Sequence, residues 1–476
     1  MLDILITNGY IITLEGIGVG IIEDGAVGIK DDRIVVVGDT SEVIKRYKAH
    51  RYIDAENKAV MPGLIDAHIH TGIGLLRGVA QDIDNWMLEG MWPFESKIRL
   101  DVEAIKIGSM MNILESLKAG TTTFCDFDTP MDQIVENHYK IGTRARVAEL
   151  ISGLPKDTSS IKVGDLFPID TEIESGKLKR NLNLINEWHE KDNDRITCLL
   201  GPQAPDMVTK SLLLEVKNLS EKMGIGIHMH VSQGARENEQ TMKRYGKRSI
   251  PFLDEIGYLD ESLMAIHLTD ATKEETQYLG NSGVGMVICS CGTALLGGKV
   301  PPAFEFLEVS DRLALGSDEA PGNNCCNMFN EMKFTSLLNK CRQVSPTVFP
   351  AWKVLRMATI EAAKTIGLGD QIGSLEVGKK ADIIIIDLMQ PALGPIIKYP
   401  IRNIVPNLVY SAKGSEVQTV IIDGKIIVDN FEVLTVDEKQ IMRDSMVAAK
   451  RVCEAAAPEF FKKNTPLYHM MKEGKL

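Results

Sequence analysis

The chain has 476 residues, enough for two or three average domains or for one large barrel with an appendage. Hydrophobic residues make up 44% of it and charged residues 25%, as in a globular protein. Lys and Arg number 53 against 65 Asp and Glu, and the net charge of −12 argues against nucleic acid or an anionic membrane as the main partner. No apolar run is long enough for a membrane span, and the N-terminus lacks a secretion signal, so we expect a cytoplasmic protein.

The first sixty residues have the pattern of short strands, which we expect at residues 4–14, 25–29, 34–38 and 52–59. From Pro62 onward the pattern changes to strand, loop and helix, repeated along the chain. The expected strands lie at residues 64–68, 122–127, 144–151, 196–201, 225–231, 263–268, 285–290 and 313–317. Helical spacing of apolar residues separates most of them, at residues 102–119, 178–190, 211–223, 273–281 and 328–338.

Eight strands that alternate with helices predict an α/β fold, a (β/α)8 TIM barrel over residues 62–367. A closing helix is expected at residues 351–366, and β character then returns at residues 383–386, 417–422 and 425–428. These strands resemble those before residue 60 in character. We therefore predict a small composite β-sandwich domain from both chain ends, residues 1–61 and 368–435, and a helical tail at 436–476.

Four of the nine histidines fall at the carboxyl ends of the expected barrel strands, where the functional groups of such barrels collect. His68 and His70 end the first strand and point the same way, because side chains alternate along a strand. His230 follows the fifth strand, His267 ends the sixth, and Asp318 follows the eighth. Imidazole nitrogens with a carboxylate suit Zn²⁺, with Fe²⁺ or Co²⁺ as alternatives. We therefore predict a metal site made of His68, His70, His230 and Asp318.

A metal in this site would lower the pKa of a bound water to about 7 and supply a nucleophile. Asp318 would both bind the metal and accept the proton of that water, and His267 would orient the water or stabilise an oxyanion. The alternative for His267 is a polar strand residue capped by Thr269. His228 competes with His230, but His230 is nearer the strand's carboxyl end, so His228 is assigned to the shell beneath the metal. The remaining histidines are expected at the surface: His50, His138, His189 and His469.

With these residues in place, the chain resembles the amidohydrolase superfamily, in the branch of methylthioadenosine/S-adenosylhomocysteine deaminases and triazine chlorohydrolases. The resemblance is carried by the segments Pro62–His70, Leu75–Gly78, Trp92–Glu95, Leu315–Asp318 with Asn323-Asn324, and Gly373–Asp382. It implies one divalent metal, because no lysine ends the fourth strand, and it implies that His267 activates the water. It also implies a small-molecule substrate contacted by Trp92, Glu95 and Asn323, and a homo-oligomer of two or more subunits.

Three positions depart from the family pattern. Gln233 stands where deaminases of this branch carry a glutamate that shuttles a proton, and a glutamine amide can donate a hydrogen bond but cannot cycle a proton. Gln203 replaces a histidine that usually contacts the base, and Glu149 replaces an arginine that grips a substrate carboxylate. The exchange at Glu149 disfavours a carboxylate-bearing substrate.

The sequence leaves three functions open. The first is metal-dependent deamination of a small N-heterocyclic or amidine-type substrate. The second is hydrolysis of a urea, amide, carbamate or chloro-triazine bond, which would explain Gln233 because the leaving group could depart without a proton from glutamate. The third is a barrel retained as a scaffold after catalysis was lost, which the complete set of metal ligands opposes.

Overall fold

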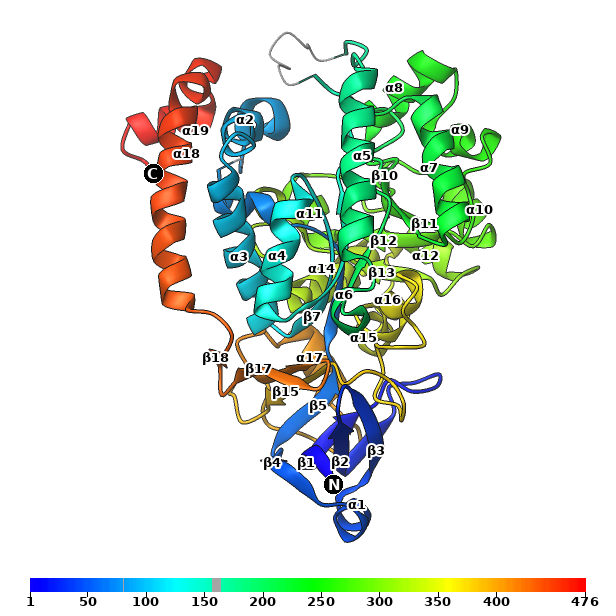
Figure 1. Ribbon diagram of the computed structural model, residues 1–476, viewed down its shortest axis with the longest axis vertical. Helices are drawn as coiled ribbons and strands as arrows, with labels where there is room; N and C mark the ends of the chain where they lie inside the picture. The colour runs from blue at the N-terminus through cyan, green and yellow to red at the C-terminus, as the bar shows by residue number, and fades with distance from the viewer. Residues whose placement is uncertain (80, 156–163) are drawn as a thin grey trace.

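The computed structural model describes residues 1–79, 81–155 and 164–476. The molecule has an α/β body with a smaller sheet domain at one end (Figure 1). The N-terminus lies in the sheet domain, and the last helices of the chain lie along one side of the body (Figure 1). Within the described residues, none of the helices combines the length and the hydrophobicity that crossing a bilayer requires.

The sheet domain contains strands from both ends of the chain. They are β1 (Leu2–Ile12), β2 (Ile21–Lys30), β3 (Arg33–Asp39), β4 (Ala49–Asp54), β5 (Lys58–Pro62), β15 (Ile383–Asp387), β16 (Val417–Ile422), β17 (Lys425–Asp429) and β18 (Glu432–Val433). Their order is β18-β17-β16-β15-β5-β1-β2-β3, with β4 paired to β1. The two chain ends meet where β5 and β15 pair antiparallel, with Val60 opposite Ile385. One sheet therefore joins both ends, and its division into the two layers of a sandwich stays a prediction.

Local sequence explains these strands. β15 contains four consecutive isoleucines, all of them buried, and β-branched side chains favour an extended backbone. The single strand expected at residues 52–59 is wrong, because the chain turns after Asp54. Asn57 adopts a left-handed conformation with φ of 59° in that turn, and a new strand begins at Lys58.

All eight strands expected in the body are present. They are β6 (Leu64–His70), β7 (Thr121–Asp128), β8 (Arg144–Glu149), β9 (Ile196–Cys198), β10 (Ile227–Val231), β11 (Leu263–His267), β12 (Gly285–Ile288) and β13 (Leu313–Leu315), followed by a short β14 (Asp318–Glu319). They form two parallel sheets, β14-β6-β7-β8-β9 and β10-β11-β12-β13. A bridge from Leu200 to Ile227 links the sheets on one side, and the chain running from β13 into β14 reaches β6 on the other. Because neighbouring strands are parallel, their carboxyl ends lie at one edge.

Helices alternate with these strands. They are η1 (Thr71–Leu76), η2 (Trp86–Met91), α2 (Trp92–Ile98), α3 (Val102–Lys118), α4 (Met131–Ile141), α5 (Thr171–Trp188), α6 (Lys191–Asp194), α7 (Lys210–Met223), α8 (Ala235–Tyr245), α9 (Ser249–Glu255), α10 (Lys273–Asn281), α11 (Ser290–Leu295), α12 (Ala303–Leu307), α13 (Ala320–Asn323) and α14 (Met328–Gln343). Capping residues fix several ends. The Thr209 hydroxyl accepts from the Leu212 amide at the start of α7, and Gly224, with φ of 67°, ends that helix.

The rest of the chain adds α1 (Thr40–Arg46), α15 (Ala351–Met357), α16 (Ile360–Thr365), α17 (Ile404–Tyr410), α18 (Glu438–Lys463) and α19 (Pro466–Lys472). The last two of these helices lie within residues 436–476, where a helical tail is expected. The single closing helix expected at residues 351–366 is wrong, because Thr359 has φ of −137° and ψ of −103° and separates α15 from α16. α18 leaves the sheet domain and runs beside α3 toward α2 (Figure 1).

Candidate metal centre and catalytic pocket

The first strand of the body presents two histidines to the centre of the strand ends. His68 and His70 lie at the end of β6, and both are buried. They are two residues apart on one strand, so their rings lie close together, with centroids 4.7 Å apart in an edge-on arrangement. The alternation of side chains predicted from the sequence therefore holds.

Two more groups from distant strands reach the same point. His230 ends β10, and its Nε2 lies 3.3 Å from His68 Nε2. Asp318 begins β14, and its Oδ1 lies 3.4 Å from His68 Nε2 and 3.5 Å from His70 Nε2. Ligands about 2.0–2.1 Å from a zinc ion at tetrahedral angles stand about 3.4 Å apart. These three distances are those expected between metal ligands, and the structure gathers the four residues predicted to hold the metal around His68. Ligand atoms of His68, His70 and His230 lie within 4.8 Å of one another, and so do those of His68, His267 and Asp318.

The Nδ1 atoms of His68 and His70 are engaged by protein groups. His70 Nδ1 donates to the carbonyl oxygen of Phe127, which leaves Nε2 for a metal. His68 Nδ1 lies 2.7 Å from His228 Nε2, so His228 does lie beneath the cluster. Burial holds the pKa of His68 and of His230 well below the ordinary histidine value, and lowers that of His228 to about 3. The imidazoles are therefore neutral, the form that binds a metal.

A buried aspartate connects the strand that carries the histidines to the segment that carries Asp318. The Asp66 carboxylate accepts from the backbone amides of His68, at 3.3 Å, and Ser317, at 2.9 Å, and from the Ser317 hydroxyl. Burial raises the pKa of Asp66 to about 7. Asp318 follows Ser317 directly and has a left-handed backbone with φ of 63°, a conformation that such a network can hold.

His267 lies at the end of β11, beside the cluster, with its ring stacked on that of His230 at a centroid distance of 5.1 Å. It has a left-handed backbone with φ of 78°. Its Nε2 is buried and has no hydrogen-bond partner among the described residues. An unpartnered buried ring nitrogen beside a metal shell fits a group that bonds to water or substrate.

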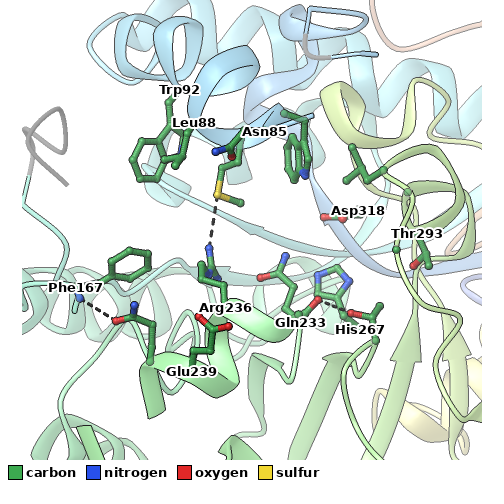
Figure 2. A pocket seen from close by; sticks show the side chains of 18 of the residues that line it. Asn85, Leu88, Trp92, Phe167, Gln233, Arg236, Glu239, His267, Thr293 and Asp318 are labelled. Atoms are coloured by element: carbon green, nitrogen blue, oxygen red, sulfur yellow. Dashed lines mark hydrogen bonds between the residues drawn. The ribbon is translucent and has the colours of Figure 1, made fainter. Parts of the chain in front are cut away.

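A cavity of about 480 Å³ opens from Asp318 and His267. Trp86, Trp92 and Phe167 supply aromatic surface to this catalytic pocket. Figure 2 shows Leu88 and Trp92 on one side of it, with Phe167 and Arg236 on the other and Asp318 and His267 at one end. Aromatic and aliphatic side chains thus supply much of the lining, Arg236 and Glu239 add charged groups near Phe167, and Asp318 and His267 make one end polar, a mixture that suits a small organic molecule.

Gln233 lines the pocket next to His267 (Figure 2). The Glu237 carboxylate accepts from the backbone amides of Ser232, at 2.7 Å, and Gln233, at 2.9 Å, and the Thr269 hydroxyl donates to the Gln233 carbonyl. Burial raises the pKa of Glu237 to about 7. Two bonds therefore fix the backbone of Gln233 and a third fixes that of Ser232 before it, while the Gln233 side-chain amide faces the pocket.

The other residues predicted to bind substrate differ in their positions. Trp92 lines the pocket. Glu95 accepts from Arg99 at 3.1 Å, and Gln203 lies between β9 and β10, where its carbonyl accepts from the amide of His230 at 3.0 Å. Glu149 is buried and accepts from the Thr129 hydroxyl at 2.6 Å and the Met131 amide at 2.9 Å.

Asn323 uses its amide nitrogen inside the protein, donating to the Ser317 carbonyl at 2.6 Å and to Glu331 Oε1 at 2.9 Å. None of Glu95, Gln203, Glu149 and Asn323 is among the described residues that line the cavity. Their contact with substrate stays a prediction.

Sequence reasoning missed several supporting residues. Asp66 and Glu237 hold the metal-bearing and pocket-bearing loops, and Arg236 and Phe167 line the pocket. Asp66 belongs to the first histidine motif and could have been noticed as an acidic residue inside an apolar strand. The expectation of a surface position is wrong for His138, which is fully buried and lies 3.1 Å from the Asp126 carboxylate.

Buried histidines and one carboxylate, gathered beside a pocket with aromatic lining, indicate a metal-dependent hydrolase. Comparison with known proteins gives the family. The model of the amidohydrolase family matches residues 59–427. The chain is 36% identical to the 5-methylthioadenosine/S-adenosylhomocysteine deaminase of Thermoanaerobacter pseudethanolicus, over 91% of this chain and 96% of that one. It is 33% identical to the 5'-deoxyadenosine deaminase of Methanosarcina barkeri, over 95% and 99% of the two chains.

Among solved structures, an adenosine deaminase from Xanthomonas campestris with bound zinc is similar, with a TM-score of 0.86 and 28% identity over 95% of this chain and 98% of that one. The chain therefore belongs to the amidohydrolase family, and it is a hydrolase that acts on C–N bonds. The family predicted from the sequence is confirmed.

Proposed function

We propose that this protein is a zinc-dependent aminohydrolase that deaminates an adenosine-type heterocycle. The observation that carries the proposal is the position of the four-residue metal shell at one end of an aromatic pocket. Relatives that share a third of their residues with the chain over nearly its whole length are named as deaminases of adenosine derivatives. The similar solved structure carries zinc, which supports the choice of metal.

We assign His68, His70, His230 and Asp318 to the metal. When bound there, the metal supplies a nucleophile by lowering the pKa of water. Asp318 turns Oδ1 toward the imidazoles, so its second oxygen can accept the proton of the attacking water. His267 Nε2 has no partner among the described residues, and it is assigned to orient the water or to stabilise the developing oxyanion.

Gln233 is the group that leaves a second reaction open. Its amide can donate a hydrogen bond to a ring nitrogen, but it cannot deliver and recover a proton. Hydrolysis of a urea, amide, carbamate or chloro-triazine bond needs less help of that kind. We therefore keep this reaction as the second candidate, on the ground of Gln233 alone.

Ammonia release tests the proposal. The zinc-loaded protein would be assayed with adenosine, 5-methylthioadenosine, a pterin, an aminotriazine and a guanidine, with ureas, amides and a chloro-triazine in parallel. Ammonia from the adenosines supports deamination, whereas chloride or a released amine without ammonia supports the second candidate. No product from any compound after loading with Zn²⁺, Fe²⁺ or Co²⁺ would contradict both and favour a scaffold.

The finer points of the architecture are also proposals. We propose that the eight body strands close into a (β/α)8 barrel over residues 62–367, supported by the Leu200–Ile227 bridge and by the pairing of Asp318 with Ile69. The β-sandwich would cover residues 1–61 and 368–435, with residues 436–476 as a tail. A homo-oligomer and a cytoplasmic location stay predictions.

A further inference from the structure

One side of the catalytic pocket is made by two short consecutive helices, η2 and α2. Trp86, Met87, Leu88 and Trp92, which we call the aromatic wall, line the cavity from this side. Figure 2 shows Leu88 and Trp92 across the pocket from Phe167 and Arg236. A flat heterocycle placed between these surfaces would depend on the position of the wall, because stacking energies fall quickly as ring faces separate.

Few polar contacts fix the wall from the side of the pocket. Gln81 donates to the Pro321 carbonyl before the wall begins, and Met87 Sδ lies 3.6 Å from Arg236 Nη1, a weak contact. After the wall, Arg99 binds Glu95 and Asp128 at the end of α2. The chain between Gln81 and Arg99 therefore needs support from its outer side.

α18 supplies that support. It runs along α3 and reaches α2 (Figure 1). Ion pairs connect it to α3 on the way, from Glu438 to Lys118 at 2.8 Å and from Arg451 to Asp101 at 2.6 Å. α18 is thus held in place before it meets the wall.

At its far end, α18 packs against α2, and a ring pair and an ion pair are among the contacts between the two helices. The ring of Phe460 lies 5.2 Å from that of Phe94 at an angle of 55°, and both side chains are less than a tenth exposed. Glu459 Oε2 lies 3.3 Å from Lys97 Nζ, and this pair is partly exposed to solvent. Phe94 comes two residues after Trp92 on α2, so the buried Phe460–Phe94 pair fixes the helix that carries Trp92.

We propose that Phe460 is a positioning residue for substrate binding, which holds the aromatic wall against the ring of the substrate through Phe94. In this proposal α18 controls how tightly the pocket binds the substrate ring, although the proposed metal ligands lie on the strands of the body. This inference rests on the proposed function for the nature of the ring, but it concerns binding rather than the chemical step.

The test compares two neighbouring phenylalanines of α18 in the full-length, zinc-loaded protein. Phe460 contacts α2, whereas Phe461 is 48% exposed and stacks on Tyr468 of α19. We expect Phe460→Ala to raise the KM for 5-methylthioadenosine about tenfold and to change kcat less than about twofold. Phe461→Ala should leave both constants at the wild-type values, and Phe460→Leu should recover most of the lost affinity.

Two further readouts separate positioning from general damage. Hydrogen exchange should become faster in residues 85–98 of Phe460→Ala and stay unchanged in β6, and the zinc content should equal that of the wild type. An unchanged KM, an equal fall of kcat and kcat/KM, or the same defect in Phe461→Ala would overturn the inference.

Tryptophan fluorescence, titrated with 5-methylthioadenosine, measures binding without turnover. If the wild-type protein binds 5-methylthioadenosine but releases no ammonia, the proposed deamination is contradicted. The inference about Phe460 still holds in that case if Phe460→Ala weakens the binding. Failure of wild-type protein to bind the probe at all would overturn the inference as well.

Discussion

The two ends of the catalytic pocket are built in different ways. The proposed metal ligands lie on β6, β10 and β14, where β6 pairs with β7 and β14, β10 pairs with β11, and the buried Asp66 bonds to His68 and Ser317. The aromatic wall lies on two short helices that a distant helix supports through a ring pair. Coordination tolerates only small changes in ligand spacing, whereas a stacking surface tolerates more. The comparison teaches that this protein places its chemistry on strands and its affinity for the ring on helices.

The largest expected effect lies at the metal end. Asp318→Asn keeps the shape of the side chain but replaces the carboxylate that accepts the proton, so we expect kcat to fall about 10²–10⁴-fold. Far-ultraviolet circular dichroism should stay unchanged, and zinc analysis would show how much metal is retained. A kcat within a few-fold of the wild type would contradict the role of Asp318 as proton acceptor.

The two ends should also differ in how stability depends on pH. Burial holds the pKa of His68, His230 and His228 below the ordinary value, so each imidazole takes up a proton only on unfolding. The unfolded state then binds more protons below pH of about 6.5, and stability is lost as the pH falls through that value. We expect metal-free protein to lose about 1.4 kcal/mol per pH unit below about pH 6.5 for each such histidine.

Urea unfolding of chelator-treated protein from about pH 7.5 to about pH 5 measures this slope. Phe460→Ala should lower the free energy of unfolding by the same amount at every pH, because the substitution removes no titrating group. The buried carboxyls of Asp66 and Glu237, whose pKa is raised to about 7, add a slope of the opposite sign in this range, so the histidine contribution is measured as the difference in slope between the wild type and His228→Asn. Equal slopes for the two proteins would show that His228 is not buried as a neutral group.

The metal end could be predicted from the sequence because its signals are local. His68 and His70 are two residues apart on an apolar strand, His230 and His267 lie at the carboxyl ends of β10 and β11, and Asp318 follows β13. Parallel strands then force their ends to one edge, so no long-range information is required. His138 shows the limit of this reasoning, since its helical spacing carries no sign of the buried Asp126 that pairs with it.

The wall could not be predicted in the same way. Trp92 was selected by resemblance alone, and nothing near Phe94 in the chain indicates that Phe460 packs on it. The break of the closing helix at Thr359 and the turn at Asn57 were missed for a similar reason, because tertiary contacts there decide a conformation that local propensity leaves open. Glu149 and Asn323 bond to neighbouring protein groups, and their contact with substrate stays a prediction.

Gln233 lies between the two ends and tests how they cooperate. A glutamate at position 233 could perform the proton transfer that the amide cannot. We therefore expect Gln233→Glu to raise the rate of ammonia release from an aminohydrolase substrate by about tenfold or more. The backbone bonds from Glu237 and Thr269 are independent of the side chain at 233 and should survive the change. A large loss of activity would instead show that the chemistry requires the amide, which would favour the second candidate reaction.

The smallest effect is expected where the wall meets solvent. Lys97 and Glu459 form an ion pair whose side chains are 32% and 39% exposed, and such pairs contribute about 0–1 kcal/mol. We expect Lys97→Met to change the KM for 5-methylthioadenosine less than about twofold, at low or high salt, because the buried ring pair beside it is retained. A rise in KM in Lys97→Met as large as that in Phe460→Ala, together with a similar rise in the wild type at high salt, would mean that charge and not ring packing positions the wall. The aromatic pair would then be a consequence of the helix contact and not its cause.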